Sequence, residues 1–342
     1  MIRTITIVSA LLTAPASAFY VEDSESLLVN PVLTQIPAEN TLTSYANDAP
    51  ASDRGPLPER GSFQAVTYNI AGLPEVISRS SPSRNTQIIG RLLNSYDLVL
   101  VQEDFFYHGE LLSASRHPFR SKPYDGKSII GDGLNQLSVF PFSLVQREAW
   151  TDCHGYVSAS MDCWASKGFT FSRLSVTPGI EIDVYNLHFD AGGSMKDDAV
   201  RRSNIKQLLR SVEAASEGRP VIIGGDTNLD SGEASDEILL ESFRRRGGFR
   251  IACREANCRH ESKDRFLFRS GDNVRLDVLG WSVPAAFVDD NGYALSDHAP
   301  VAATYRWQLI PHLEPLYAGP LTYPFLCQSE ESKLGQPLVD NH

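Results

Sequence analysis

The strongest constraint on the fold is a series of polar motifs, each of which follows or ends a short apolar run typical of a β-strand. The last motif is Ser296-Asp297-His298, followed by Pro300. The earlier motifs are Thr67-Tyr68-Asn69, Gln102-Glu103, Asn186-Leu187-His188, Gly225-Asp226-Thr227-Asn228 and Arg275-Leu276-Asp277. Loops at strand ends can project side chains into a shared cleft, so the sequence predicts one site built from many strands.

Around these motifs the sequence indicates one large domain of the α/β class. Eight β-rich runs lie at residues 63–69, 98–102, 137–140, 168–175, 181–187, 221–224, 277–281 and 299–305. Two stretches, 85–94 and 196–215, have a helical pattern. The chain has 342 residues, 42% of them hydrophobic, which is enough to bury a large core. We therefore predict packed β-sheets covered by helices.

The two ends of the chain have a different character. Residues 1–18 combine Arg3, an apolar stretch and Ala16-Ser17-Ala18, as in a secretory signal peptide with its cleavage site. A buried N-terminal helix would explain this pattern less well. Residues 19–60 indicate an extended or disordered leader, and residues 308–342 a proline-rich tail. We expect an exported protein, extracellular or periplasmic, whose folded part is residues 61–307.

The five cysteines fit an oxidising compartment. Cys153 with Cys163 and Cys253 with Cys258 are close pairs that predict two disulfides, which leaves Cys327 over. A zinc site is the alternative, but the spacings lack a nearby CxxC or HxxxH partner. We expect the two disulfides.

The formal net charge is -11. Proteins that bind the nucleic-acid backbone without sequence preference are usually basic, because they neutralise phosphates with Lys and Arg. We therefore expect no stable complex with nucleic acid.

Two of the motifs supply oxygen ligands for a metal ion. Glu103 offers a carboxylate and Asn69 an amide oxygen, each at a strand end. Mg²⁺ prefers oxygen ligands and retains several waters, so these two groups and a substrate phosphate would suffice; Mn²⁺ is a possible substitute. Taken alone, Glu103 could equally be a solvated loop carboxylate.

The histidines and the Gly-Asp-Thr-Asn motif supply acid–base and phosphate-binding groups. His298 is the candidate general base, since an ordinary pKa of about 6.5 suits proton removal from water. Asp226 would position that water, and Asn228, two residues on, would donate to a phosphoryl oxygen. His188 would hydrogen-bond the phosphoryl oxygens, unless it is only a strand-end histidine. Lys167, beside Gly168, would neutralise a phosphodiester.

This ordered set of motifs resembles the endonuclease/exonuclease/phosphatase superfamily over about residues 61–307. The segment Asp162-Cys163-Trp164-Ala165-Ser166-Lys167-Gly168 is similar to the Asp-x-x-x-x-Lys-Gly segment of neutral sphingomyelinases, and so is the stretch from Gln102 to Leu112. The resemblance implies a four-layered α/β sandwich of two packed mixed β-sheets flanked by helices. It also implies that residues 61–307 are a catalytic domain.

The resemblance further implies roles for three acidic residues. Asp277 would orient the other ring nitrogen of His298. Asp297 would be a second carboxylate near the metal or a ligand of a second metal. Asp162 would pair with Lys167 and orient it, although a plain surface pair remains an alternative.

Aromatic residues follow the predicted metal ligand directly. Phe105 and Phe106 could contact a lipid headgroup or acyl chain, but core packing is an equally good interpretation. Secreted bacterial sphingomyelinases carry a long hydrophobic hairpin before the Ser-Asp-His segment, and Asp277 and Asp297 are too close together for it. The sequence therefore does not support membrane insertion by that device, although a peripheral membrane contact stays possible.

We expect a secreted Mg²⁺-dependent phosphodiesterase of the sphingomyelinase C type, acting on a phospholipid or another phosphodiester. An exported nuclease of the same fold is the first alternative. A catalytically inactive binding protein is the second, and it is disfavoured because every expected catalytic residue type is present.

Overall fold

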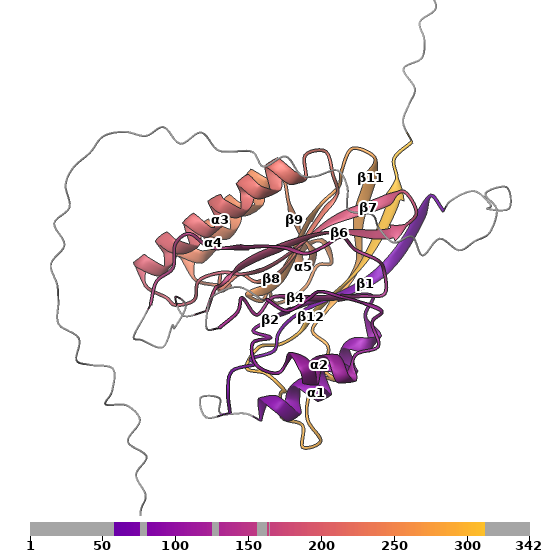
Figure 1. Ribbon diagram of the computed structural model, residues 1–342. Helices are drawn as coiled ribbons and strands as arrows, with labels where there is room; N and C mark the ends of the chain where they lie inside the picture. Colours follow the sequence, from indigo (N-terminus) through magenta and orange to yellow (C-terminus); the bar gives the residue numbers. More distant parts are fainter. Residues whose placement is uncertain (1–57, 76–80, 125–129, 156–162, 164, 312–342) are drawn as a thin grey trace, which may run out of the picture. The chain divides into compact units, whose positions relative to one another are not determined.

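The protein is described by a computed structural model, which places residues 58–75, 81–124, 130–155, 163 and 165–311 (Figure 1). The predicted signal peptide, nearly all of the leader and most of the tail lie outside the described residues. So do Asp162, Trp164 and Cys327, which were named above. The described fold runs from β1, which begins at Arg60, to β12, which ends at Leu309.

The first of two six-stranded sheets has the strand order β11-β12-β1-β2-β4-β3. Its strands are β1 (Arg60–Asn69), β2 (Leu98–Gln102), β3 (Phe119–Arg120), β4 (Asn135–Ser138), β11 (Val274–Ser282) and β12 (Val301–Leu309). β1 and β2 are parallel and the other neighbours are antiparallel. The parallel pair brings the carboxyl ends of β1 and β2 to one edge of the sheet.

The second sheet has the order β5-β6-β7-β8-β10-β9. Its strands are β5 (Gln146–Ala149), β6 (Gly168–Thr177), β7 (Ile180–His188), β8 (Val221–Asp226), β9 (Arg250–Ile251) and β10 (Asp264–Arg269). Here β7 and β8 are parallel, and β10 runs antiparallel to β8. Both sheets are therefore mixed, as expected.

Two of the helices have a clear local reason for where they begin or end. The helices are α1 (Pro82–Leu92), α2 (His108–Ala114), α3 (Met195–Ala215), α4 (Ala234–Gly247) and α5 (Ala252–Glu255), with a 3₁₀ turn η2 (Leu93–Ser95) after α1. α3 starts with a capping box, in which Ser194 and Asp197 each bind the other's backbone N–H. The C-cap of α4 is Gly248, whose φ of 66° is the left-handed conformation typical of that position.

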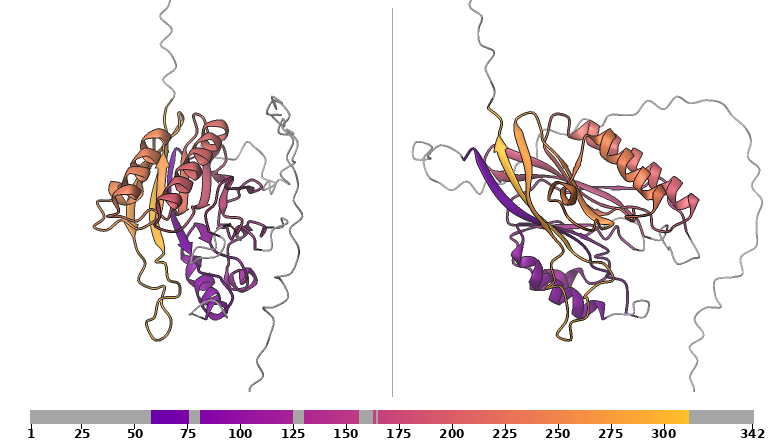
Figure 2. Two further views of the ribbon diagram at one scale, coloured as in Figure 1. Left: turned by 90° about the vertical axis from the view of Figure 1, so that its left-hand side faces the viewer. Right: turned by 180° about the vertical axis from the view of Figure 1, so that it is seen from behind.

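Three apolar clusters separate four layers of secondary structure. Leu100 of β2 and Ile222 of β8 belong to the cluster between the two sheets. Ile223, the next residue of β8, belongs instead to the cluster beneath α3 and α4, because side chains alternate along a strand. Val99 of β2 packs in the third cluster, beneath α1 and α2. Figure 2 shows α3 and α4 side by side on the outer face of the second sheet. The layers confirm the predicted sandwich.

Each of the eight predicted runs overlaps a strand, and both predicted helices are present. The predicted run 137–140 agrees least well with its strand, since β4 covers Asn135–Ser138. Several elements were not predicted, among them α4 and β10. The omission of β10 matters most, because its first residue is Asp264.

Both predicted disulfides are present. Cys153 is bonded to Cys163, and Cys253 to Cys258, with sequence separations of 10 and 5. The sulfur atoms are therefore not available as the thiolate ligands that a zinc site needs. Among the helices of the described ranges, none has the length and apolar character needed to cross a membrane.

Candidate active site

The carboxyl ends of strands from both sheets meet at Asn69, the last residue of β1. Its Nδ2 atom lies 2.9 Å from Glu103 Oε1, just beyond β2, and 3.2 Å from Asp226 Oδ2, the last residue of β8. Asn69 and Asp226 are buried, and Glu103 is partly exposed. The structure thus brings together three predicted site residues that are far apart in the sequence.

A buried polar network beneath these residues ties the two sheets together. Gln102 Nε2 donates to Asn186 Oδ1 at 2.7 Å and to Thr67 Oγ1 at 3.0 Å. Asn186 Nδ2 in turn donates to the carbonyl of Val101 at 2.9 Å. Unpaired polar groups would be costly here, so these bonds fix the relative position of β1, β2 and β7.

The backbone around the site adopts unusual conformations. Glu103 and Asn228 have φ values of 56° and 46°, which are uncommon for residues other than glycine. Such strain persists only where the surrounding structure enforces it, and it concentrates at functional sites. Gly72 N donates to Glu103 O at 2.9 Å, and Asp104 N donates to Gly133 O at 3.0 Å, so both sides of Glu103 are held.

Gly225 provides a test of this backbone geometry. Its φ is 150°, and a Cβ atom there would lie 2.1 Å from the carbonyl oxygen of Leu187. Gly225→Ala should therefore lower the free energy of unfolding by on the order of 2–4 kcal/mol. Gly193→Ala, where an added Cβ meets nothing within 4 Å, is the matched control and should change it by less than about 0.5 kcal/mol. Equal effects in urea unfolding would contradict the structure.

His298 is held by an acidic partner on the opposite sheet. Its Nδ1 atom lies 2.7 Å from Oδ2 of Asp264, the first residue of β10. The other ring nitrogen, Nε2, lies 3.5 Å from Asn69 Nδ2 and 3.7 Å from Asp226 Oδ2. Asp264 therefore fixes the ring so that Nε2 faces the carboxylates, as a general base requires.

The prediction that Asp277 orients His298 was wrong. Asp277 lies on β11 of the first sheet, where it binds Arg275 Nε at 3.0 Å and Arg306 Nη2 at 3.1 Å. β11 is separated from β1 by β12, whereas β10 is the direct neighbour of β8 in the second sheet. The signal for Asp264 was an acidic residue at the start of the run Asp264-Arg265-Phe266-Leu267-Phe268, which strand patterning could have identified.

Burial and charge together set the protonation of the His298–Asp264 pair. Burial, and next the charge of Asp226, raise the pKa of Asp264 to about 6. Burial opposes protonation of His298, but the hydrogen bond to Asp264 and the charge of Asp226 raise its pKa to about 9. The pair is therefore an ion pair at neutral pH when no cation is bound.

His188, at the end of β7, is neutral in this site. Burial, and next the charge of Lys167, hold the pKa of His188 well below its usual range. Its Nε2 atom lies 3.4 Å from Asp226 Oδ2 and 3.9 Å from Glu103 Oε1. Asn228 is close by: its backbone N–H donates to Asp226 Oδ1 at 2.9 Å, and its Nδ2 donates to Phe189 O at 3.0 Å.

The donor set around Asn69 fits a divalent cation. Burial raises the pKa of Glu103, with Lys167 and the hydrogen bond from Asn69 opposing it, so a carboxylate sits there at a cost that a cation would offset. Asp264 Oδ1 is buried with no hydrogen-bond partner among the described residues. Asp226, Asp264 and His298 also place ligand atoms within 4.8 Å of one another. Asn69 currently directs Nδ2 at the carboxylates while Oδ1 accepts from Ala71 N, so its amide would have to turn to act as a ligand.

Two further predicted site residues are Asp297 and Lys167. Asp297 is exposed and accepts a hydrogen bond from Ser296 Oγ at 3.3 Å; among the described residues it makes no hydrogen bond or ion pair with Glu103 or Asn69. Lys167 acts electrostatically on Glu103 and His188, while its predicted partner Asp162 lies outside the described residues.

The two phenylalanines after Glu103 differ in their surroundings. Phe105 is partly buried, and an added Cβ at Gly133 would lie 2.6 Å from its ring. Phe106 is 49% exposed. Packing against Gly133 supports a core role for Phe105, and a lipid contact of either residue stays a prediction.

The sequence shows which family the chain belongs to, over a region that contains the whole site. The sequence profile of the Endonuclease/Exonuclease/phosphatase family matches residues 66–298, from Val66 in β1 to the histidine of the site. The chain belongs to this family. The match contains every site residue described above, from Asn69 to His298.

The chain is also similar to proteins named sphingomyelinase. The chain is 32% identical to a sphingomyelinase of Mycobacterium tuberculosis over 293 residues, which cover 78% of this chain and 56% of that protein. The chain thus spans little more than half the length of this relative.

Two solved structures show the same fold. Sphingomyelinase C from Streptomyces griseocarneus superposes with a TM-score of 0.54 at 21% identity, covering 71% of this chain and 99% of that one. A beta toxin of Staphylococcus aureus, a double mutant with bound magnesium ions, gives a TM-score of 0.54 at 17% identity and covers 71% of this chain and 99% of that one.

Proposed function

We propose that this protein is an exported Mg²⁺-dependent phosphodiesterase that hydrolyses sphingomyelin or a related phospholipid to a phosphorylated headgroup and a neutral lipid. The observation that carries the proposal is the His298–Asp264 pair, in which the other ring nitrogen of His298 faces Asp226 beside Glu103 and Asn69. Similarity to a sphingomyelinase supports the lipid substrate.

His298 and Asp264 would act as the base and its positioning partner. Nε2 of His298 would take a proton from the attacking water, while Asp264 keeps the ring oriented and stabilises the imidazolium that forms. Asp226 would hold the water beside Nε2, from which its Oδ2 lies 3.7 Å. Its negative charge is secured, since burial alone would raise its pKa but His188, His298 and Lys263 lower it to about 2.

The other groups would bind the phosphoryl oxygens. His188 and Asn228 would donate to them as negative charge develops, and Lys167 would neutralise the phosphodiester. A Mg²⁺ held by Glu103 and Asn69 would polarise the phosphoryl group and, by opposing the carboxylates, lower the pKa of His298 toward neutrality. Asp297, which is exposed and accepts a hydrogen bond from Ser296 Oγ, would serve as a second carboxylate near the metal.

Export is proposed on two grounds. Residues 1–18 have the pattern of a secretory signal peptide. Cys153–Cys163 and Cys253–Cys258 are disulfides of a kind that persists in oxidising compartments. We propose that the substrate is met outside the cytoplasm, with at most a peripheral contact to the membrane.

A substrate panel tests the proposal. Sphingomyelin, phosphatidylcholine, inositol phosphates and plasmid DNA are incubated with the protein and Mg²⁺, and phosphocholine release and DNA nicking are measured. We expect phosphocholine from sphingomyelin or a related choline phospholipid and little nicking, because a net charge of -11 offers few distributed phosphate contacts.

Two variants sharpen the panel. Lys167→Ala should reduce the lipid activity strongly, because it removes charge next to Glu103 and His188. Arg245→Ala, on α4 and ion-paired at the surface with Glu241, is the control and should change it little. Efficient DNA nicking without phosphocholine release would reject the lipid substrate and favour a nuclease with the same fold and site.

A further inference from the structure

Four neighbouring strands of the second sheet end or begin at the site. β7 ends at His188 and β8 at Asp226, and these two residues are paired in register. Asp226 is paired in turn with Asp264, where β10 begins. On the other side, Phe169 of β6 pairs with Leu187, so Lys167 stands at the same edge of the sheet. A residue just before β10 therefore flanks the site opposite Lys167.

That residue is Lys263, which none of the sequence motifs included. Its backbone carbonyl accepts hydrogen bonds from Thr227 N at 3.0 Å and Thr227 Oγ1 at 2.7 Å. Thr227 is buried and lies next to Asp226. The backbone of Lys263 is thus fixed directly beside the residue proposed to hold the water.

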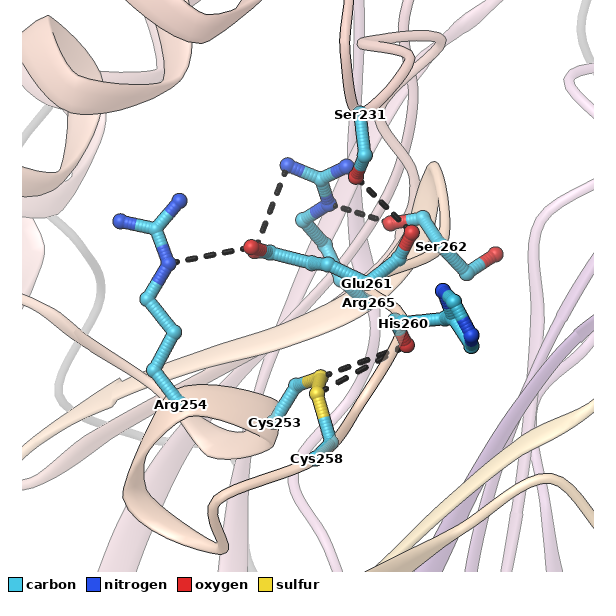
Figure 3. Close-up of a disulfide and its surroundings, with 8 residues drawn as sticks. All are labelled: Ser231, Cys253, Arg254, Cys258, His260, Glu261, Ser262 and Arg265. Atoms are coloured by element: carbon cyan, nitrogen blue, oxygen red, sulfur yellow. Dashed lines mark hydrogen bonds and ion pairs between the residues drawn. A yellow bond between two sulfur atoms is a disulfide. The ribbon is translucent and has the colours of Figure 1, made fainter.

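The segment leading to Lys263 is held as well (Figure 3). The Cys253–Cys258 disulfide ties α5 to its start, and both sulfur atoms lie 3.6 Å from His260 O. Ser231 Oγ donates to Glu261 O at 2.8 Å. The buried guanidinium of Arg265 donates to Ser262 O at 2.8 Å and to Leu229 O at 2.6 Å. These hydrogen bonds join residues 258–265 to the loop after β8.

Lys263 is partly buried. The charge acts on four groups, which are His188, Asp226, Asp264 and His298. In the described ranges of the chain its ammonium group makes no hydrogen bond and no ion pair within 4.0 Å. An ammonium group with no protein partner in this part of the chain remains available to bind an anion at the end of these strands.

We propose that Lys263 is a second phosphate-binding cation of this site and holds a non-bridging oxygen of the substrate's phosphoryl group from the side opposite Lys167. The inference rests on the proposed function, because it assumes a phosphodiester between β6 and β10. Lysine binds phosphate as a compact point charge with three donors, so it can follow the oxygen as the phosphodiester becomes a phosphomonoester product. Lys167 would act mainly on the side of Glu103, and Lys263 on the side of Asp226 and His298.

Ligand binding tests this assignment without turnover. Binding of inorganic phosphate and of phosphocholine to the full chain is measured by calorimetry at a fixed Mg²⁺ concentration. Lys263→Met keeps the aliphatic stem and should raise both dissociation constants by a similar factor, roughly 10- to 100-fold, because the lost bond is to the phosphoryl oxygens. Lys263→Arg should retain most of the affinity. In the lipid assay Lys263→Met should raise KM for sphingomyelin.

Lys206→Met, at an exposed position of α3, is the matched control and should bind both ligands as the wild type does. Circular dichroism and the unfolding midpoint confirm that the variants are folded. Unchanged phosphate affinity in folded Lys263→Met, or an equal loss in Lys206→Met, would overturn the assignment. The proposed lipid substrate can fail separately: the wild type would then bind phosphate and lose it in Lys263→Met, yet release no phosphocholine from lipid.

Discussion

Asp264→Asn should lower kcat for phosphodiester hydrolysis by a factor on the order of 10²–10⁴, whereas Asp277→Asn should leave it within about threefold. Asp264 accepts the hydrogen bond of His298 Nδ1 at 2.7 Å, and its charge stabilises the imidazolium that forms when His298 takes a proton. The neutral amide of Asn can present an N–H there instead and turn the ring or select the wrong tautomer. Asp277 binds Arg275 and Arg306 near the surface instead.

His298→Ala should lower kcat to a similar extent as Asp264→Asn, and the double variant should be little worse than either one, because the two residues act as a unit. Steady-state kinetics of the wild type and the four variants, with circular dichroism to show that each is folded, makes the comparison. If Asp277→Asn lost activity and Asp264→Asn kept it, the pairing observed in the structure would be wrong and the original sequence prediction right.

Removal of divalent metal should abolish activity completely, and added Mg²⁺ or Mn²⁺ should restore it. Asn69 and Glu103 supply few protein ligands, so binding is expected to be modest and reversible, with substrate completing the coordination shell. The measurement is activity after treatment with a chelator and after titration of each metal. Calorimetric titration with Mg²⁺ alone gives a second readout that does not depend on turnover.

Two controls make the metal experiment decisive. Chelator already saturated with Mg²⁺ should leave activity unchanged, which excludes a direct effect of the chelator on the protein. Glu103→Gln keeps the size of the side chain but removes its charge, so it should weaken Mg²⁺ binding by roughly tenfold or more. Full activity in a metal-free preparation would reject the assignment of a metal-dependent enzyme.

Local sequence patterns were sufficient for much of the fold. The eight predicted runs are strands because β-rich alternation is local information, and α3 was visible from its helical spacing. α4 was missed because six of its 14 residues are charged and its apolar positions are few. Short strands such as β3 and β9, with two residues each, carry no periodicity to detect.

The site was predictable where each residue follows its own strand, and not where a partner had to be chosen. Asn69, Glu103, Asp226 and His298 all lie together as expected. Asp264 and Asp277 both belong to strands between the Gly-Asp-Thr-Asn and Ser-Asp-His motifs, and only the strand order decides which reaches His298. That order depends on pairing between residues far apart in sequence, which a single sequence does not contain.

The junction between the sheets has a consequence for how activity and folding are linked. Asn69 and Glu103 come from the first sheet and Asp226 and Asp264 from the second, and His298 enters just before β12. Neither half of the sandwich therefore carries a working set of groups. A fragment that folded on one sheet alone would be inert, and two such fragments would recover turnover only by docking in the native alignment. Fragment complementation would thus use catalysis as a sensitive reporter of how the two halves fit together.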